Sequence, residues 1–148
     1  MDIGPPREMV SDEDIAALLR GVRRVAVLGI KTEEQANQPA FYVPRYLLEA
    51  GLEVVPVPVY YPDVRTILGR DVHRTVAAIP APAVDLVDVF RRPADVKAHV
   101  SDLLAAHPKA VWLQLGIRDD AATAELVKAG IYVVQDRCLM VDHRRFCG

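Results

Sequence analysis

The chain has 148 residues, a formal net charge of −2 and 51% hydrophobic residues, which fits one domain, residues 1–148, with a core of its own. This charge gives no support for nucleic acid as a partner, because domains that bind nucleic acid present a strongly basic face. No apolar run reaches the ~18 residues of a membrane span, and Met1 to Ser11 lack the apolar core of a signal peptide. We therefore expect a cytoplasmic protein without a membrane partner, and we expect residues 1–10 to be flexible.

The first predicted elements are a helix and a buried strand. Ser11 and the acidic residues after it predict the N-terminus of an amphipathic helix that ends at Gly21. The apolar run over residues 24–28 is typical of a strand that is buried on both faces, as in a parallel sheet covered by helices. Gly29 follows where the chain must turn out of the sheet, at the edge where ligands bind in open α/β folds.

A polar loop and a second helix–strand pair follow. A helix is expected over residues 39–50, with Pro39 in its first turn and with Pro44 as an awkward residue inside it. The second strand is expected over residues 53–57, where its prolines favour an early end. Residues 72–78 are ambiguous between a short strand and a helical turn.

The second half of the chain repeats the strand–helix alternation. Strands are predicted at residues 84–90, 110–115 and 131–134, and amphipathic helices are predicted to begin at Pro93 and at Asp119. About five mainly parallel strands alternating with helices predict an α/β fold, a Rossmann-like doubly wound sheet with three αβα layers.

Three familiar nucleotide and hydrolase motifs are missing. The dinucleotide fingerprint needs Gly-x-Gly-x-x-Gly and an acidic residue after the second strand, whereas Gly29 stands alone and Val55-Pro56-Val57-Pro58 is not acidic. There is no Gly-Lys-Ser/Thr phosphate loop and no Gly-x-Ser-x-Gly nucleophile turn. Ordinary NAD binding and serine hydrolysis are therefore disfavoured.

The two cysteines give little support for metal or covalent chemistry. Cys138, His143 and Cys147 have a spacing that could contribute to a zinc site together with Asp142, but no second cluster completes it. Cys138 as a nucleophile lacks an identified base. We expect two reduced thiols, no metal and no catalytic residue.

Two segments suggest ligand contacts at strand ends. Arg91 and Arg92 precede Pro93, so two guanidinium groups are expected beside a helix N-terminus that favours anions. Alternatively, one arginine is solvated while the other pairs with Asp88 or Asp95. Gln114, at the end of a strand, could meet a ligand amide or hold neighbouring backbone in place.

Five segments in this order carry a resemblance to a known family: Val25-Ala26-Val27-Leu28-Gly29, Tyr42-Val43-Pro44-Arg45-Tyr46-Leu47, Val87-Asp88-Val89-Phe90-Arg91-Arg92-Pro93, Val111-Trp112-Leu113-Gln114-Leu115-Gly116-Ile117 and Asp136-Arg137-Cys138-Leu139. From about Ser11 to its end, the chain resembles the small stand-alone CoA-binding proteins of bacteria and archaea. Their fold is similar to the CoA-binding domain of the succinyl-CoA synthetase α subunit. The sequence departs from the family pattern at Ile30-Lys31 and at Val57-Pro58-Val59.

The resemblance implies that CoA lies across the carboxyl edge of the sheet. It assigns the phosphates to the first turn and the following helix, the adenosine to the end of the second strand, and the pantetheine side to the turn after the third strand. The implied binding residues, in that order, are Gly29, Ile30, Lys31, Tyr42 and Arg45; Val57, Pro58 and Tyr60; and Val89, Phe90, Arg91 and Arg92.

The resemblance also implies binding without catalysis. In the synthetase, the phosphorylated histidine belongs to a second domain that this chain is too short to contain. We therefore expect non-catalytic binding of CoA or an acyl-CoA. Two alternatives stay open: an enzyme that acts on a CoA thioester or a nucleotide through Cys138 or His143, and a regulatory or interaction subunit that binds no ligand.

Overall fold

The computed structural model describes residues 3–148 and contains a five-stranded sheet in which all strands are parallel, in the order β2-β1-β5-β6-β7. Its strands are β1 (Arg24–Leu28), β2 (Glu53–Val57), β5 (Leu86–Val89), β6 (Ala110–Leu113) and β7 (Tyr132–Val134). A small antiparallel hairpin is formed by β3 (Thr66–Ile67) and β4 (Arg70–Asp71). The predicted parallel α/β fold is confirmed.

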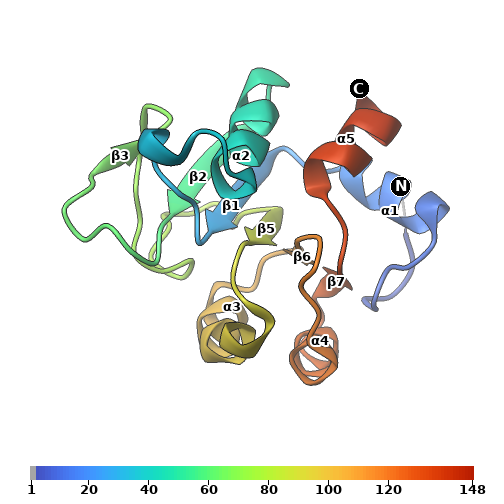
Figure 1. Cartoon of the computed structure of the whole chain (residues 1–148). Helices are drawn as coiled ribbons and strands as arrows, with labels where there is room; N and C mark the ends of the chain where they lie inside the picture. Colours follow the sequence, from blue (N-terminus) through green and yellow to red (C-terminus); the bar gives the residue numbers. More distant parts are fainter. Residues whose placement is uncertain (1–2) are drawn as a thin grey trace.

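Helices cover both faces of the sheet (Figure 1). One face packs against α1 (Asp12–Arg20), α2 (Pro39–Glu49) and α5 (Leu139–Cys147). The other face packs against the 3₁₀ helix η2 (Pro93–His99), α3 (Val100–Ala106) and α4 (Asp120–Lys128). Alternate residues of each strand enter the two cores, because successive side chains of a strand point to opposite faces.

The alternating sequence of β5 is fully buried rather than half exposed. Asp85, just before it, accepts hydrogen bonds from the backbone N–H groups of Arg23 and Arg24 at 2.8 and 2.9 Å. Asp88 lies in register between Val27 and Trp112, is 0% exposed, and neither of its carboxyl oxygens has a hydrogen-bond partner. Burial raises the pKa of Asp88 well above its ordinary value.

Pro44 is accommodated inside a continuous α2. A proline cannot donate to the carbonyl of the residue four positions earlier, which here is Ala40. That carbonyl instead accepts a hydrogen bond from the backbone N–H of Lys31 at 3.1 Å. The hydrogen bond from Lys31 therefore joins the loop after β1 to the N-terminal turn of α2.

Part of the N-terminal segment that was expected to be flexible pairs with the sheet. Glu8 forms a parallel bridge with Val133, and the backbone N–H of Met9 donates to the carbonyl of Val133 at 2.7 Å. The Met9 side chain is buried beneath this segment. Met1 and Asp2 lie outside the described residues.

Three further elements differ from the sequence-based expectations. The helix that begins at Pro93 starts as seven residues of 3₁₀ helix before it becomes α-helical. Residues 72–78 contain no strand, and α5 was not predicted. Within residues 3–148, no helix combines the length and the apolarity needed to cross a membrane.

Candidate functional site

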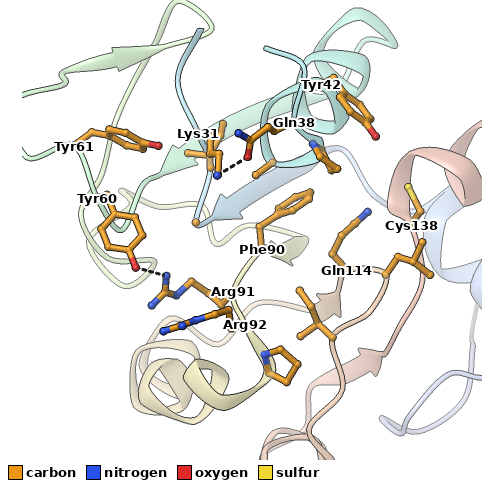
Figure 2. A pocket seen from close by; sticks show the side chains of 17 residues that line it. Lys31, Gln38, Tyr42, Tyr60, Tyr61, Phe90, Arg91, Arg92, Gln114 and Cys138 are labelled. Carbon is orange, nitrogen blue, oxygen red and sulfur yellow. Dashed lines mark hydrogen bonds between the residues drawn. The ribbon is translucent and has the colours of Figure 1, made fainter. Parts of the chain in front are cut away.

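A cavity of about 720 Å³ opens at the carboxyl ends of β1, β5 and β6. The strand order reverses between β1 and β5, so this is the crevice where ligands bind in doubly wound sheets. Figure 2 shows that loops from both sides of the sheet meet here. The lining residues are Gly29, Ile30, Lys31, Gln38, Pro39, Ala40, Tyr42, Tyr60, Tyr61, Phe90, Arg91, Arg92, Pro93, Gln114, Leu115, Ile117 and Cys138.

Gly29 brings the turns after β1 and β5 together. Its φ of +87° favours glycine, and a Cβ at this position would lie far inside contact distance of the Phe90 carbonyl oxygen. The N–H of Gly29 donates to the Val57 carbonyl at 2.8 Å, and the N–H of Phe90 donates to the Leu28 carbonyl at 2.8 Å. The wall of the cavity is therefore built from backbone that only glycine allows to approach so closely.

Lys31 supplies a cation beside the N-terminus of α2. Its ammonium group donates to Gln38 Oε1 at 2.5 Å, next to the first helical residues, Pro39 and Ala40 (Figure 2). The N-terminal end of a helix favours anions through its macrodipole and its unpaired N–H groups. The side chain and the helix end therefore favour negative charge at the same place.

Arg91 is held in place inside the cavity, with 15% of its side chain exposed. Its Nε donates to His99 Nε2 at 3.1 Å, and its Nη1 donates to the Tyr60 hydroxyl at 3.5 Å. The Arg91 guanidinium lowers the pKa of the Tyr60 phenol through this hydrogen bond. Burial first, and the positive charge of Arg91 second, lower the pKa of His99.

Arg92 is differently placed. Its side chain is 82% exposed and its Nε pairs with Asp95 at 2.8 Å, and this hydrogen bond lowers the pKa of Asp95. Of the two carboxylates considered as partners from the sequence, Asp95 is therefore the one used, and Asp88 is not. The alternative in which one arginine is solvated and the other is ion-paired agrees with the structure, because Arg92 is exposed and Arg91 also pairs with Asp95, at 3.7 Å. Both arginines line the cavity, and their binding of an anion there stays a prediction.

The loop that carries the two tyrosines is organised by Arg74. Its guanidinium donates to the carbonyls of Tyr60, Tyr61, Pro62 and Val64. The Arg74 guanidinium thereby satisfies backbone carbonyls that have no helix or sheet partner in this irregular segment. The loop forms the side of the cavity opposite α5 (Figure 2).

Gln114 holds neighbouring backbone in place, one of the two roles considered from the sequence, and its contact with a ligand amide stays a prediction. Its Oε1 accepts a hydrogen bond from the N–H of Leu139 at 3.2 Å and so fixes the first turn of α5. The same side chain lines the cavity next to Cys138, the N-cap residue of α5 (Figure 2). Trp112 Nε1 holds the preceding segment by donating to the Arg137 carbonyl at 2.8 Å.

Eight of the twelve predicted binding residues line the cavity and four do not. Val57 and Val89 lie in the core of the sheet, and Pro58 is also buried. The side chain of Arg45 is exposed, with its guanidinium 5.7 Å from the centre of the Phe41 ring. The resemblance implied these strand-end residues, but a parallel strand directs alternate side chains into the core.

Nine lining residues were not among the predicted binding residues: Gln38, Pro39, Ala40, Tyr61, Pro93, Gln114, Leu115, Ile117 and Cys138. Two signals were available. Pro39 at the first position of a helix marks an anion-binding N-terminus beside the crevice, and Gln114 and Leu115 directly follow a predicted strand. No comparable local signal exists for Cys138, because it reaches the cavity only through the packing of α5.

The residues considered for a metal do not form such a site. The described part of the chain, residues 3–148, holds no cluster of three or more His, Cys, Asp or Glu side chains suited to a metal ion. His143 belongs to α5 and faces α2, where its Nδ1 shares a hydrogen bond with the Tyr46 hydroxyl at 2.9 Å, and burial lowers its pKa. Asp142 pairs with Arg137 at 2.6 Å.

Residues 23–144 match the sequence profile of the family described as CoA binding domain. The chain belongs to this family. It is 27% identical, over 133 residues, to the uncharacterised protein YneT of Bacillus subtilis (strain 168), covering 90% of this chain and 94% of YneT.

Solved structures extend this likeness. Cell-free ID.343 from Thermus thermophilus is 39% identical with a TM-score of 0.82, covering 93% of this chain and 99% of that one. A hypothetical protein from Pyrococcus horikoshii OT3 is 30% identical with a TM-score of 0.83, covering all of both chains. The dinucleotide-forming acetyl-coenzyme A synthetase 1 of Ca. Korarchaeum cryptofilum shares the fold at 18% identity and a TM-score of 0.64, over 27% of its length.

Proposed function

We propose that this member of the CoA binding domain family binds CoA or an acyl-CoA without transforming it. The observation that carries the proposal is the composition of the cavity at the switch point of the sheet. Three cationic side chains, Lys31, Arg91 and Arg92, line it, and no carboxylate does so among the described residues. A ligand with several negative charges suits this lining, and the family match supports CoA as that ligand.

The two ends of the cavity differ in chemistry, which suggests an orientation for CoA. The tyrosine loop and Arg91 offer aromatic and cationic surfaces for the adenosine (Figure 2). Lys31, Arg92 and the N-terminus of α2 suit the phosphates. Phe90, Gln114 and Leu115 lead away from the cations and suit the pantetheine arm, which has an apolar body and amide groups.

The lining also favours binding over chemistry. Among the described residues that line the cavity there is neither a histidine nor a carboxylate, the groups that serve most often as general acids and bases. His143, considered earlier for a chemical role, lies outside the cavity. Catalysis on a CoA thioester would therefore depend on Cys138 without a neighbouring base.

Calorimetric titration in reducing buffer tests the proposal. CoA and acetyl-CoA should both bind with a stoichiometry of about one per chain. Ligand at about 100 times Kd should stabilise the fold by about 2.7 kcal/mol, seen as a rise in Tm. Absence of both heat and Tm shift at saturating CoA would refute CoA binding and would leave the ligand-free interaction subunit.

A second measurement separates binding from catalysis. Acetyl-CoA incubated with the protein should release no free CoA thiol above the rate of a buffer control. Turnover that disappears in Cys138→Ala but persists in Cys147→Ala would contradict non-catalytic binding and support the enzyme alternative.

A further inference from the structure

Cys138 is a thiol inside the candidate binding cavity. It is free and half-buried, at the N-cap of α5. Figure 2 shows it at the end of the cavity opposite Tyr60 and Tyr61, with Phe90 and Gln114 between. Tyr60, Tyr61, Arg91 and Arg92 are therefore toward one end of the cavity, and Cys138 is at the other (Figure 2).

Gln114 shows that this end of the cavity suits a polar chain. The side chain is 4% exposed, and its Nε2 has no hydrogen-bond partner among the described residues, while its Oε1 is occupied by the Leu139 N–H. The amide is directed into the cavity, next to Cys138 (Figure 2). Its Nε2 is a hydrogen-bond donor for which an amide carbonyl of a bound ligand would be a suitable acceptor.

The proposed orientation of CoA brings its sulfur to this end. With the phosphates at Lys31 and Arg92, the pantetheine arm runs past Phe90 and Gln114. Its two amide groups are of the kind that Gln114 can bind, and the sulfur is its last atom. The thiol end of the ligand is thereby directed toward Cys138.

Resting on the proposed function, we propose that Cys138 undergoes thiol–disulfide exchange with a CoA disulfide bound in this cavity, so that the protein holds CoA as a mixed disulfide. Cys138 gives its proton to water, and its sulfur attacks the CoA sulfur that occupies the cavity. The Cys138–CoA disulfide forms as the original S–S bond breaks, and the other half leaves as a thiolate that takes up a proton. The cysteine is oxidised and the departing half is reduced, so no further oxidant is needed.

The lining favours this reaction over acyl transfer to the same sulfur. Acyl transfer passes through a tetrahedral oxyanion and is assisted by a general base and oxyanion donors. Disulfide exchange needs only the approach of a thiolate to the S–S bond. A cavity with a cysteine but with no histidine or carboxylate among its described lining residues fits the second requirement.

Intact-mass spectrometry under non-reducing conditions tests the inference. The reduced, desalted protein is incubated with CoA disulfide, and the mass should increase by one CoA unit that dithiothreitol removes. Cys138→Ser should abolish the adduct, and Cys147→Ser should retain it, because Cys147 is an exposed thiol outside the cavity. Peptide mapping of the wild-type adduct locates it independently, should Cys138→Ser not fold.

Specificity is measured against oxidised glutathione. Binding raises the effective concentration of the disulfide, so CoA disulfide should modify Cys138 at least about tenfold faster than oxidised glutathione does. Acetyl-CoA, which has no free thiol, should slow the reaction by occupying the cavity. Equal rates for both disulfides, no effect of acetyl-CoA, or modification chiefly at Cys147 would each overturn the inference.

The outcome also separates this inference from the proposed function. If Cys138→Ser and the wild type bind CoA in reducing buffer but the wild type forms no adduct with CoA disulfide, only the exchange reaction is refuted. If neither protein binds CoA, the proposed function itself fails.

Discussion

At the scale of single residues, Gly29 has the most demanding position in the described chain. Its positive φ and the closeness of the Phe90 carbonyl both require the absence of a Cβ. Gly116 has the same φ of +87° but open space around the position of its Cβ. Comparing the two glycines therefore separates the energetic cost of a positive φ from the cost of steric overlap between a Cβ and the Phe90 carbonyl.

Gly29→Ala should therefore destabilise the fold by about 3 kcal/mol or more, whereas Gly116→Ala should cost about 1–2 kcal/mol from φ alone. Urea unfolding followed by circular dichroism measures both. Similar losses in the two variants would mean that the approach of the β1 and β5 turns can relax.

Arg91 and Arg92 are adjacent in sequence and both pair with Asp95, at 3.7 and 2.8 Å, but Arg91 is 15% exposed and Arg92 is 82% exposed. Arg91→Ala should weaken CoA binding by about 1.5–3 kcal/mol, because it removes a charge-assisted contact from a side chain that is already oriented. Arg92→Ala should weaken CoA binding less than Arg91→Ala does, since its side chain is exposed and pairs with Asp95 at 2.8 Å. Calorimetric titration gives both values.

Arg45→Ala is the matched control for these two variants, because this exposed arginine lies outside the cavity. Its affinity for CoA should equal that of the wild type. A loss as large as that of Arg91→Ala would place CoA elsewhere on the surface of α2.

Asp88 makes the stability of the protein depend on pH. Burial raises the pKa of Asp88 above its ordinary value of 3.8. The free energy of unfolding is therefore highest, as far as this group is concerned, below pH 3.8, and it falls as the pH rises toward the folded-state pKa. In that interval the unfolded state ionises first, and the loss is about 1.4 kcal/mol per pH unit.

Asp88→Asn removes this titration. Relative to the wild type, the variant should become steadily more stable as the pH rises from about 4 toward the raised folded-state pKa of Asp88, although its own buried amide adds a cost that does not vary with pH. Urea unfolding over a pH series measures the difference. A difference in stability that stays constant with pH would show that Asp88 is ionised in the folded protein.

At the scale of elements, α5 is attached to the rest of the molecule by polar contacts as well as by its apolar face. Arg137 joins Asp142 of α5 to Asp12 at the start of α1, with N–O distances of 2.6 and 2.9 Å. The Asp142 side chain is only 5% exposed. These contacts hold α5 at the angle that places Cys138 in the cavity.

Arg137→Met should destabilise the protein by about 2–4 kcal/mol, because it leaves the Asp142 carboxylate buried without its partner. Adding Asp142→Asn should recover part of this loss. The control is Arg145→Met, whose ion pair with Asp12 is exposed on both sides and should contribute little to stability. Thermal unfolding of the wild type, the double variant and the single variants, Asp142→Asn included, tests this, and additive losses in the double variant would exclude coupling.

At the scale of the whole molecule, the parts differ in how firmly they are held. The central strands β1, β5 and β6 are paired on both sides and almost fully buried. The hairpin of β3 and β4 lies outside the main sheet, and residues 58–85 around it are largely exposed (Figure 1). The tyrosine loop of the cavity belongs to this second, less buried region.

Hydrogen exchange should therefore be fastest in residues 58–85 and slowest in the three central strands. Saturating CoA should slow exchange in the tyrosine loop and in the turns after β1 and β5, while the outer surface of α4 should be unaffected. Mass-spectrometric exchange with and without CoA measures this pattern. Protection confined to another face would contradict the assignment of the cavity.

Much of the fold follows from local patterns. The strands at 24–28 and 53–57 have the predicted bounds, and the N-caps Ser11 and Asp119 accept the expected hydrogen bonds from Asp14 and Ala122. The helix α5 was missed, although Leu139, His143 and Phe146 have helical spacing and two arginines occupy its last turn. The helical pattern covers only nine residues, which is too short to predict a helix from the spacing alone.

The location of the candidate site was predictable from the sequence, but the full set of residues that line it was not. The turns after the first and third strands were expected to face one crevice, and they do. Val57 and Val89 were assigned by proximity to strand ends, whereas their side chains belong to the core. The N–H of Lys31 donates to the Ala40 carbonyl, which is available because Pro44 has no N–H. No periodic pattern in the sequence predicts this contact between a loop and a helix.

By itself, the sequence determined the parallel α/β sheet, the caps and turns that bound its elements, and the resemblance to CoA-binding proteins, because these depend on local spacing and on recurring motifs. Only the tertiary structure decided which residues share the cavity. Lys31, Arg91, Gln114 and Cys138 come together because parallel strands end at one edge and α5 packs back over it. The crossovers between strands and the packing of helices bring these residues together across more than one hundred residues of chain. Local sequence patterns do not report contacts between such distant positions.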